Sequence, residues 1–225
     1  MLKIMKNMNK EVTQERLLSF IPGDSADLYE DDVDDLLEQL TEADAMHPAA
    51  AYTEVILDQV DGDSIKSNHT KIVSSLFANN CHAGDKVYPC LITVGNEMDT
   101  FAAGLDDPML SYLQGILMNL CLDDALLSIA EEILKEHPGK KLMMVKPGVA
   151  GICELTEQQS ILSLLGDAAH TLGVTASEKG LLTPGYSSTA LLFFSESGAE
   201  HCKDWQMEEE RKRFLHEMNV IAGHI

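Results

Sequence analysis

The chain of 225 residues is poor in basic side chains. Lysine and arginine together number 16, aspartate and glutamate number 37, and the formal net charge is −21. A surface of this charge repels the phosphates of nucleic acids and of anionic lipid headgroups. The composition therefore argues against binding to nucleic acids or membrane surfaces. Such acidity also keeps a protein soluble without any partner.

Cysteine pairs at metal-binding or redox spacing are absent too. The five cysteines are scattered and odd in number, and no two are spaced as C-x-x-C. This argues against a disulfide framework and against a structural zinc site. We expect reduced thiols in a cytoplasmic protein. The five are Cys81, Cys90, Cys121, Cys153 and Cys202.

Long apolar runs and common catalytic motifs are also missing. The N-terminal stretch MLKIMKNMNKEVTQERLL lacks the apolar core of a signal peptide. We find no apolar run approaching the roughly 20 residues that span a bilayer, so we expect no membrane association. The chain has no G-x-S-x-G motif, no P-loop, no G-x-G-x-x-G fingerprint and no H-x-x-x-H pair. We therefore assign no catalytic residue and no metal ligand.

Apolar residues make up 45% of the chain, enough for a substantial core. Strands and helices mix without a regular β-α-β rhythm, which favours an α+β fold with a mostly antiparallel sheet. We expect one domain over residues 1–225, with 1–30 as a loosely attached N-terminal segment. Periodicity predicts helices at 31–40, 71–79, 97–105, 108–137, 156–166 and 203–220, and strands at 52–57, 64–66, 87–94, 141–145, 171–176, 180–182 and 187–194.

One segment stands out, VKPGVAGICELTEQQ at 145–159. A Pro147-Gly148 turn follows a short apolar run, and Thr156 with Gln159 has the spacing of a capping box at a helix start. By itself the segment has two interpretations. It is an ordinary strand-to-helix connection, or its exposed backbone N–H groups meet a ligand.

Taken in order, several segments resemble the activation domain of cobalamin-dependent methionine synthase, and more closely the free-standing family of that domain. The likeness runs from about Ala49 to Ser195. It implies a single C-shaped α+β domain with a twisted, mostly antiparallel sheet and flanking helices. The segments are DGDSIK, CHAGDKVYPCLITVGNEMD, DPMLSYLQGILMNLCLDDAL, VKPGVAGICELTEQQ and LGVTASEKGLLTPGYSSTALLFFS.

The resemblance implies a place in methionine biosynthesis. Members of this family bind S-adenosylmethionine and present its methyl group to an oxidised corrinoid held by a partner, while an electron donor reduces the corrinoid. The implied partners are a corrinoid-binding methyltransferase subunit and a reductase or flavodoxin-like donor. This chain has no corrinoid-binding D-x-H-x-x-G motif, so cobalamin would come only through the partner protein.

The family motif for S-adenosylmethionine is R-x-x-x-G-Y, and this chain departs from it. Gly148 falls on the glycine, whereas Met144 falls on the arginine and Val149 on the tyrosine. Arginine offers a fixed fork of donors for a carboxylate, and methionine offers none. The resemblance then leaves as binding residues the turn Lys146, Pro147, Gly148, Val149 and Ala150, with Glu178 to orient a polar part of the ligand.

Two of these residues have alternative interpretations. Lys146 replaces the missing positive charge if its side chain enters the cleft, and it does not if the side chain faces solvent. Glu178 is otherwise a solvated turn residue. The second hypothesis is a non-catalytic scaffold that binds a corrinoid protein and has lost the methyl donor. A third is a cleft that holds another small molecule, because a fold does not fix a function.

Overall fold

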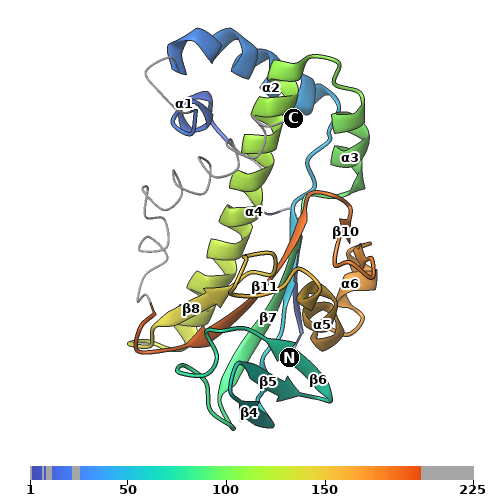
Figure 1. Ribbon diagram of the computed structural model, residues 1–225. Coiled ribbons are helices and arrows are strands. Elements are labelled where there is room, and N and C mark those ends of the chain that lie inside the picture. The colour runs from blue at the N-terminus through green and yellow to red at the C-terminus, as the bar shows by residue number, and fades with distance from the viewer. Residues whose placement is uncertain (1, 7, 9–11, 22–25, 199–225) are drawn as a thin grey trace.

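The computed structural model describes residues 2–6, 8, 12–21 and 26–198 (Figure 1). Its helices are α1 Gln14–Leu18, the 3-10 helix η1 Ala26–Tyr29, α2 Glu30–Glu42, α3 Asn96–Ala103, α4 Pro108–Glu136, α5 Glu157–Leu164 and α6 Ala168–Thr171. Its strands are β1 Lys3–Lys6, β2 Ala49–Tyr52, β3 Val55–Ile56, β4 Gln59–Asp61, β5 Ser64–Ser67, β6 Thr70–Val73, β7 Lys86–Thr93, β8 Leu142–Val145, β9 Thr175–Ala176, β10 Leu182–Thr183 and β11 Ser187–Phe194.

The central sheet has the strand order β1-β2-β7-β11-β8, with β3 also paired to β7. Every strand pairing in the described residues is antiparallel. β7 and β11, the two longest strands, form the middle of the sheet because both are rich in buried apolar residues. The α+β class with an antiparallel sheet, predicted from the sequence, is confirmed.

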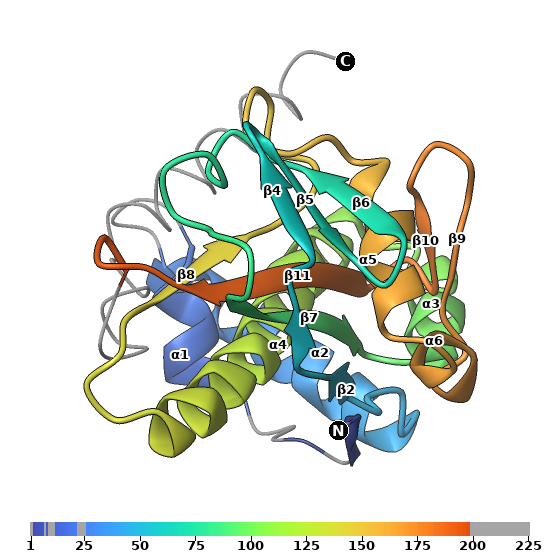
Figure 2. The same cartoon turned by 90° about the horizontal axis from the view of Figure 1, so that it is seen from below.

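Helices α1, α2 and α4 cover one face of this sheet, as the view from below shows (Figure 2). The other face is covered by the small sheet β4-β5-β6 together with α5 and α6. Side chains of β7 alternate between the two cores because successive residues of a strand point to opposite faces. Cys90 and Ile92 join the core under α4, and Val87 and Leu91 join the core under α5.

The long helix α4 runs along the molecule behind the sheet (Figure 1). Its start follows from the sequence: Asp107 accepts hydrogen bonds from the N–H groups of Met109 and Leu110, and Pro108 occupies the first turn. By length and composition alone this helix could cross a membrane, which the sequence analysis did not anticipate. Its apolar side chains are instead buried against the sheet and α2, as expected of a central core helix.

The described part of residues 1–30 contacts both the sheet and helix α4. Strand β1 pairs with β2, and the side chain of Leu17 in α1 is fully buried. Lys3 in β1 also forms ion pairs with Glu132 and Glu136 of α4. The segment is held because it closes an edge of the sheet and supplies apolar side chains to the core under α4.

Two local predictions are wrong. Residues 71–79 do not form a helix: Thr70–Val73 is strand β6, paired with β5, and turns follow it. The capping box of Thr156 is not made, because Thr156 has a helical backbone conformation and no side-chain cap hydrogen bond. The Gln159 amide instead donates to the carbonyl of Ser177. The predicted helix at 203–220 lies outside the described residues.

Candidate functional site

The turn predicted to bind a ligand connects β8 to α5. Gly148 has a φ of 100°, a left-handed conformation that favours glycine. Its N–H donates to the Cys153 carbonyl at 2.9 Å, and the Val149 carbonyl accepts from the N–H groups of Ile152 and Cys153 at 3.0 Å each. These bonds, together with an antiparallel β-bridge between Val149 and Cys153, close the turn, in which Val149 and Ala150 are exposed residues.

The side chain of Lys146 is turned toward α4. Its Nζ lies 2.7 Å from Oδ1 of Asp123, and the two side chains are 33% and 35% exposed. Lys146 therefore faces neither open solvent nor an unoccupied cleft, the two conditions that we set out from the sequence. The positive charge is present at the turn, but a carboxylate of the chain already neutralises it.

A second ion pair lies beside the first. The guanidinium of Arg16 in α1 contacts both carboxylate oxygens of Asp124, the shorter distance being 2.5 Å. Two carboxylates on one turn of α4 thus hold two cations from different parts of the chain. Sequence reasoning missed this group, although Asp123 and Asp124 are the first charged residues of α4 after a long uncharged stretch, a signal for a buried or functional role.

Met144 occupies the position at which the resemblance implies an arginine. On β8 it pairs with Leu192 of β11, and its side chain packs against the core under α4. It offers no donor to a ligand carboxylate. The cation that the turn itself supplies is Lys146, which is paired with Asp123.

Glu178 lies in the turn between β9 and β10. The structure brings this turn close to the first one, since Gly148 and Gly180 both lie against Leu155. The Gln158 amide donates to the Gly180 carbonyl at 3.0 Å and so fixes the turn on the start of α5. The Glu178 side chain itself is exposed and has no ion pair within the described part of the chain.

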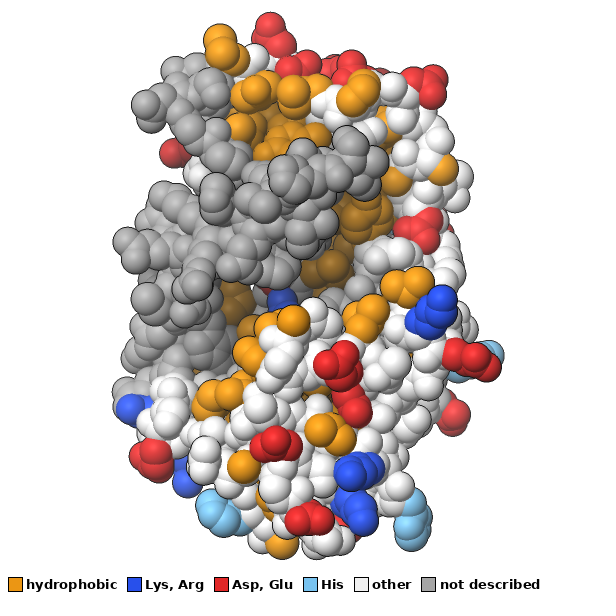
Figure 3. Space-filling view, in the orientation of Figure 1, with side chains coloured by type: hydrophobic (Ala, Val, Ile, Leu, Met, Phe, Trp, Pro, Cys, Tyr) orange, Lys and Arg blue, Asp and Glu red, His pale blue; other side chains and the backbone are white. Residues whose placement is uncertain are grey.

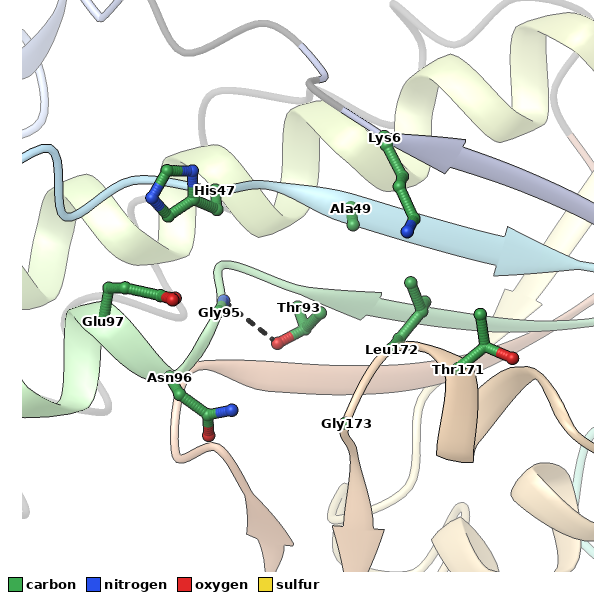
Figure 4. Close-up of a pocket in the computed structure, with 10 residues that line it drawn as sticks. All are labelled: Lys6, His47, Ala49, Thr93, Gly95, Asn96, Glu97, Thr171, Leu172 and Gly173. Carbon is green, nitrogen blue, oxygen red and sulfur yellow. Dashed lines mark hydrogen bonds between the residues drawn. The ribbon is translucent and has the colours of Figure 1, made fainter.

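A pocket of about 340 Å³ lies at the opposite edge of the sheet, and the sequence analysis did not predict it. It forms where β1, β2 and β7 meet the start of α3 and the end of α6 (Figure 4). The residues that line it are Lys6, His47, Ala49, Thr93, Gly95, Asn96, Glu97, Thr171, Leu172 and Gly173.

The four cysteines that the structure describes are buried and free. Burial raises the pKa of Cys81 and Cys121 to about 12 and that of Cys153 to about 11. Neutral thiols of this kind are poor nucleophiles and poor metal ligands. Among the described residues no group of three or more metal-ligating side chains comes together.

The surface is unevenly charged. Figure 3 shows acidic side chains gathered at the end of the molecule formed by α2. Around β4, β5 and β6 the same face carries charges of both signs and histidines. The turn at 146–153 adds two exposed apolar side chains, Val149 and Ile152. A partner that contacts this turn would therefore meet apolar as well as charged groups.

Comparison with known proteins bears on the fold. No family model matches this chain, and no curated protein matches it. Its architecture is that of an activation domain of the type that the sequence resemblance implied. In structure it is similar to the crystal structure of the MetH reactivation domain bound to AdoHcy, with a TM-score of 0.56 and 17% identity over 96% of this chain and 89% of that chain. At this level of identity the likeness shows the fold.

Proposed function

We propose that this protein binds S-adenosylmethionine at the turn of residues 146–150 and serves as an activation module for a corrinoid methyltransferase. The observation that carries the proposal is the likeness of fold over nearly the whole chain to a domain bound to AdoHcy. The turn is present, and Gly148, the one motif position that this chain keeps, has a left-handed conformation that suits a close approach of the backbone to a ligand.

The ion pair at the turn suits the amino-acid end of this ligand. S-adenosylmethionine carries an α-carboxylate and an α-ammonium group on the same carbon atom. Lys146 can donate to the carboxylate and Asp123 can accept from the ammonium group, so both charges remain paired when the ligand exchanges with the internal contact. Val149 and Ala150 are exposed residues of the same turn, and the N–H group of Ala150 would add a donor.

In this proposal the corrinoid is held by a separate methyltransferase subunit, and a reductase or flavodoxin-like protein supplies one electron. S-adenosylmethionine held by Lys146 and Asp123 would supply a methyl group to the reduced cobalt on the partner and would leave as S-adenosylhomocysteine. This favourable transfer drives the unfavourable reduction forward. The four described cysteines, which are buried and free, suit a reducing cytoplasm.

Titration calorimetry of the full chain with S-adenosylmethionine and with S-adenosylhomocysteine tests the proposal. We expect saturable binding in the micromolar range that is weakened about tenfold or more in Lys146→Ala, because a charge-assisted hydrogen bond is lost. Lys66→Ala, a change at an exposed lysine of β5, is the matched control and should bind as the wild type does. Absence of heat up to millimolar ligand would overturn the proposal.

One set of contacts favours the second candidate, a scaffold that binds a corrinoid protein without a methyl donor. Met144 offers no donor, Lys146 is already paired, and the Gly148 N–H is used within the turn. If calorimetry shows no binding, while a corrinoid-loaded methyltransferase subunit still binds the chain in a pull-down with purified proteins, the scaffold is the correct function.

A further inference from the structure

We propose that the pocket between β1, β2, β7, α3 and α6 is a second ligand site, which takes a small zwitterion of the α-amino-acid type. It lies at the β1 edge of the sheet, whereas the turn of residues 146–150 follows β8 at the other edge. The proposal does not depend on S-adenosylmethionine.

The floor of the pocket is set by strand register. Lys6 pairs with Ala49, and Ala49 pairs with Thr93, so the three residues form one row across β1, β2 and β7. Residues in one row point to the same face of a sheet. Ala49 and Thr93 have short side chains, whereas the side chain of Lys6 is long and stands above the sheet face. The short side chains of Ala49 and Thr93 therefore leave room for the pocket on this face of the sheet.

Lys6 forms one end of the pocket. Figure 4 shows its amine extending over the hollow toward Leu172 and Thr171. Within the described part of the chain Lys6 has no ion pair, in contrast to Lys3 on the same strand, which contacts Glu132 and Glu136. An ammonium group with three donors and no acceptor among the described residues is suited to a carboxylate.

Glu97 forms the other end. Its carboxylate is turned back over Gly95, so that a Cβ atom at Gly95 would lie 2.9 Å from its Oε2 (Figure 4). His47 and Asn96 lie on either side of it in the same view. No ion pair joins Glu97 to Lys6 or to another cation of the described chain, so its charge is open to an ammonium group of a ligand.

Two glycines keep the walls close to the backbone. Gly95 has a φ of 106° and Gly173 a φ of 68°, which other residues rarely adopt. A Cβ atom on Gly173 would lie 3.6 Å from the Asn96 amide nitrogen. Any larger residue at Gly95 would displace the Glu97 carboxylate, because 2.9 Å is too short for that contact.

Charge and size together define the ligand class. An anion without a cationic group would meet Glu97 and the strongly negative net charge of the chain, and a cation without an anionic group would meet Lys6. A ligand with one charge of each sign can pair its carboxylate with Lys6 and its ammonium group with Glu97. The pocket is at the small end of the range of roughly 300–1,000 Å³ for small-molecule sites, which suits a molecule the size of an amino acid.

Heteronuclear NMR of the ¹⁵N-labelled full chain tests the site. The standard L-amino acids are titrated one at a time to millimolar concentration, with propionate and propylamine as probes that carry one charge each. We expect saturable shifts at the amides of Gly95, Asn96 and Gly173 with at least one amino acid and with neither single-charge probe. Saturable shifts with propionate or propylamine alone would overturn the zwitterion assignment.

Two variants and one control complete the test. Lys6→Gln and Glu97→Gln should each weaken binding about tenfold or more, because each removes one charge-assisted contact. Lys66→Ala, a change at an exposed lysine of β5, should leave these shifts unchanged. No saturable shift with any amino acid, or shifts that persist in both glutamine variants whose spectra remain folded, would overturn the proposal.

Discussion

Lys146 and Asp123 are joined by a 2.7 Å contact between Nζ and Oδ1, although they are 23 positions apart in the sequence. The contact links the turn after β8 to the middle of α4 and neutralises the cation that this turn supplies. A ligand with both an ammonium and a carboxylate group can replace it without leaving either charge unpaired.

Asp123→Asn tests whether Asp123 receives the ammonium group of the ligand. We expect S-adenosylmethionine binding to weaken about tenfold, because one charge-assisted contact is lost. The free energy of unfolding should change by less than about 1 kcal/mol, since the pair is about one-third exposed. Asp34→Asn, in the exposed face of α2, is the control. Tighter binding in Asp123→Asn would mean that Asp123 only competes with the ligand for Lys146.

Gly148→Ala should lower the free energy of unfolding by about 1 kcal/mol or more, because alanine resists a left-handed conformation. Its Cβ would also lie 3.2 Å from Cδ1 of Leu155. Gly115→Ala is the matched control: it lies inside α4 with open space around it, and should stabilise by about 0.5–1 kcal/mol. Urea titration followed by circular dichroism measures both, and equal effects would contradict the conformational assignment.

The contact of Arg16 with Asp124 should stabilise the fold measurably. A double-mutant cycle with Arg16→Ala and Asp124→Ala is expected to give a coupling free energy of about 1–2 kcal/mol, because the contact is bidentate and partly buried. The more exposed pair of Lys3 and Glu132 should give less than about 1 kcal/mol in the same cycle. Coupling near zero for the first pair would show that α1 is held by its other contacts, among them the burial of Leu17.

The buried thiols should resist alkylation in the native protein. Burial raises the pKa of Cys153 to about 11, with the nearby Glu157 and Glu154 carboxylates adding to the effect, so almost no thiolate exists at neutral pH. Iodoacetamide followed by peptide mass mapping should find Cys81, Cys90, Cys121 and Cys153 unmodified until guanidinium is added. Rapid native labelling of Cys153 would contradict its placement under the turn.

Glu54 should contribute a pH-dependent part of the stability. The hydrogen bond from Lys86, at 2.9 Å, lowers the pKa of the Glu54 carboxyl against the opposing effect of partial burial, and Tyr88 adds a bond at 3.2 Å. A lowered pKa gives stability that is present above the unfolded-state pKa and is lost as the pH falls through the folded-state pKa. Glu54→Gln should therefore cost about 0.5–1 kcal/mol at neutral pH and much less in acid.

Urea titrations at neutral and acid pH measure this difference. Glu38→Gln, at an exposed position of α2, is the control and should show no such pH dependence. If Glu54→Gln lowers the free energy of unfolding equally at neutral and acid pH, the contacts of Glu54 with Lys86 and Tyr88 depend on the shape of the side chain and not on its charge.

The sequence by itself determined the elements with strong periodicity. The helix expected at 108–137 is α4, and the strand expected at 187–194 is β11, because apolar spacing and a run of strand-forming residues specify these segments locally. The position of the candidate turn after a strand and before a helix was also predicted, from Pro147, Gly148 and the apolar run before them.

Only the tertiary structure decided the remainder. Residues 70–73 became strand β6 because β5 offers a pairing edge, against a local pattern that favoured a helix. The partner of Lys146, the bidentate contact of Arg16 and the pocket at Lys6 all join residues far apart in the sequence. These residues come together only after the strands have paired in register and α4 has packed on the sheet. No local sequence pattern can therefore predict these contacts.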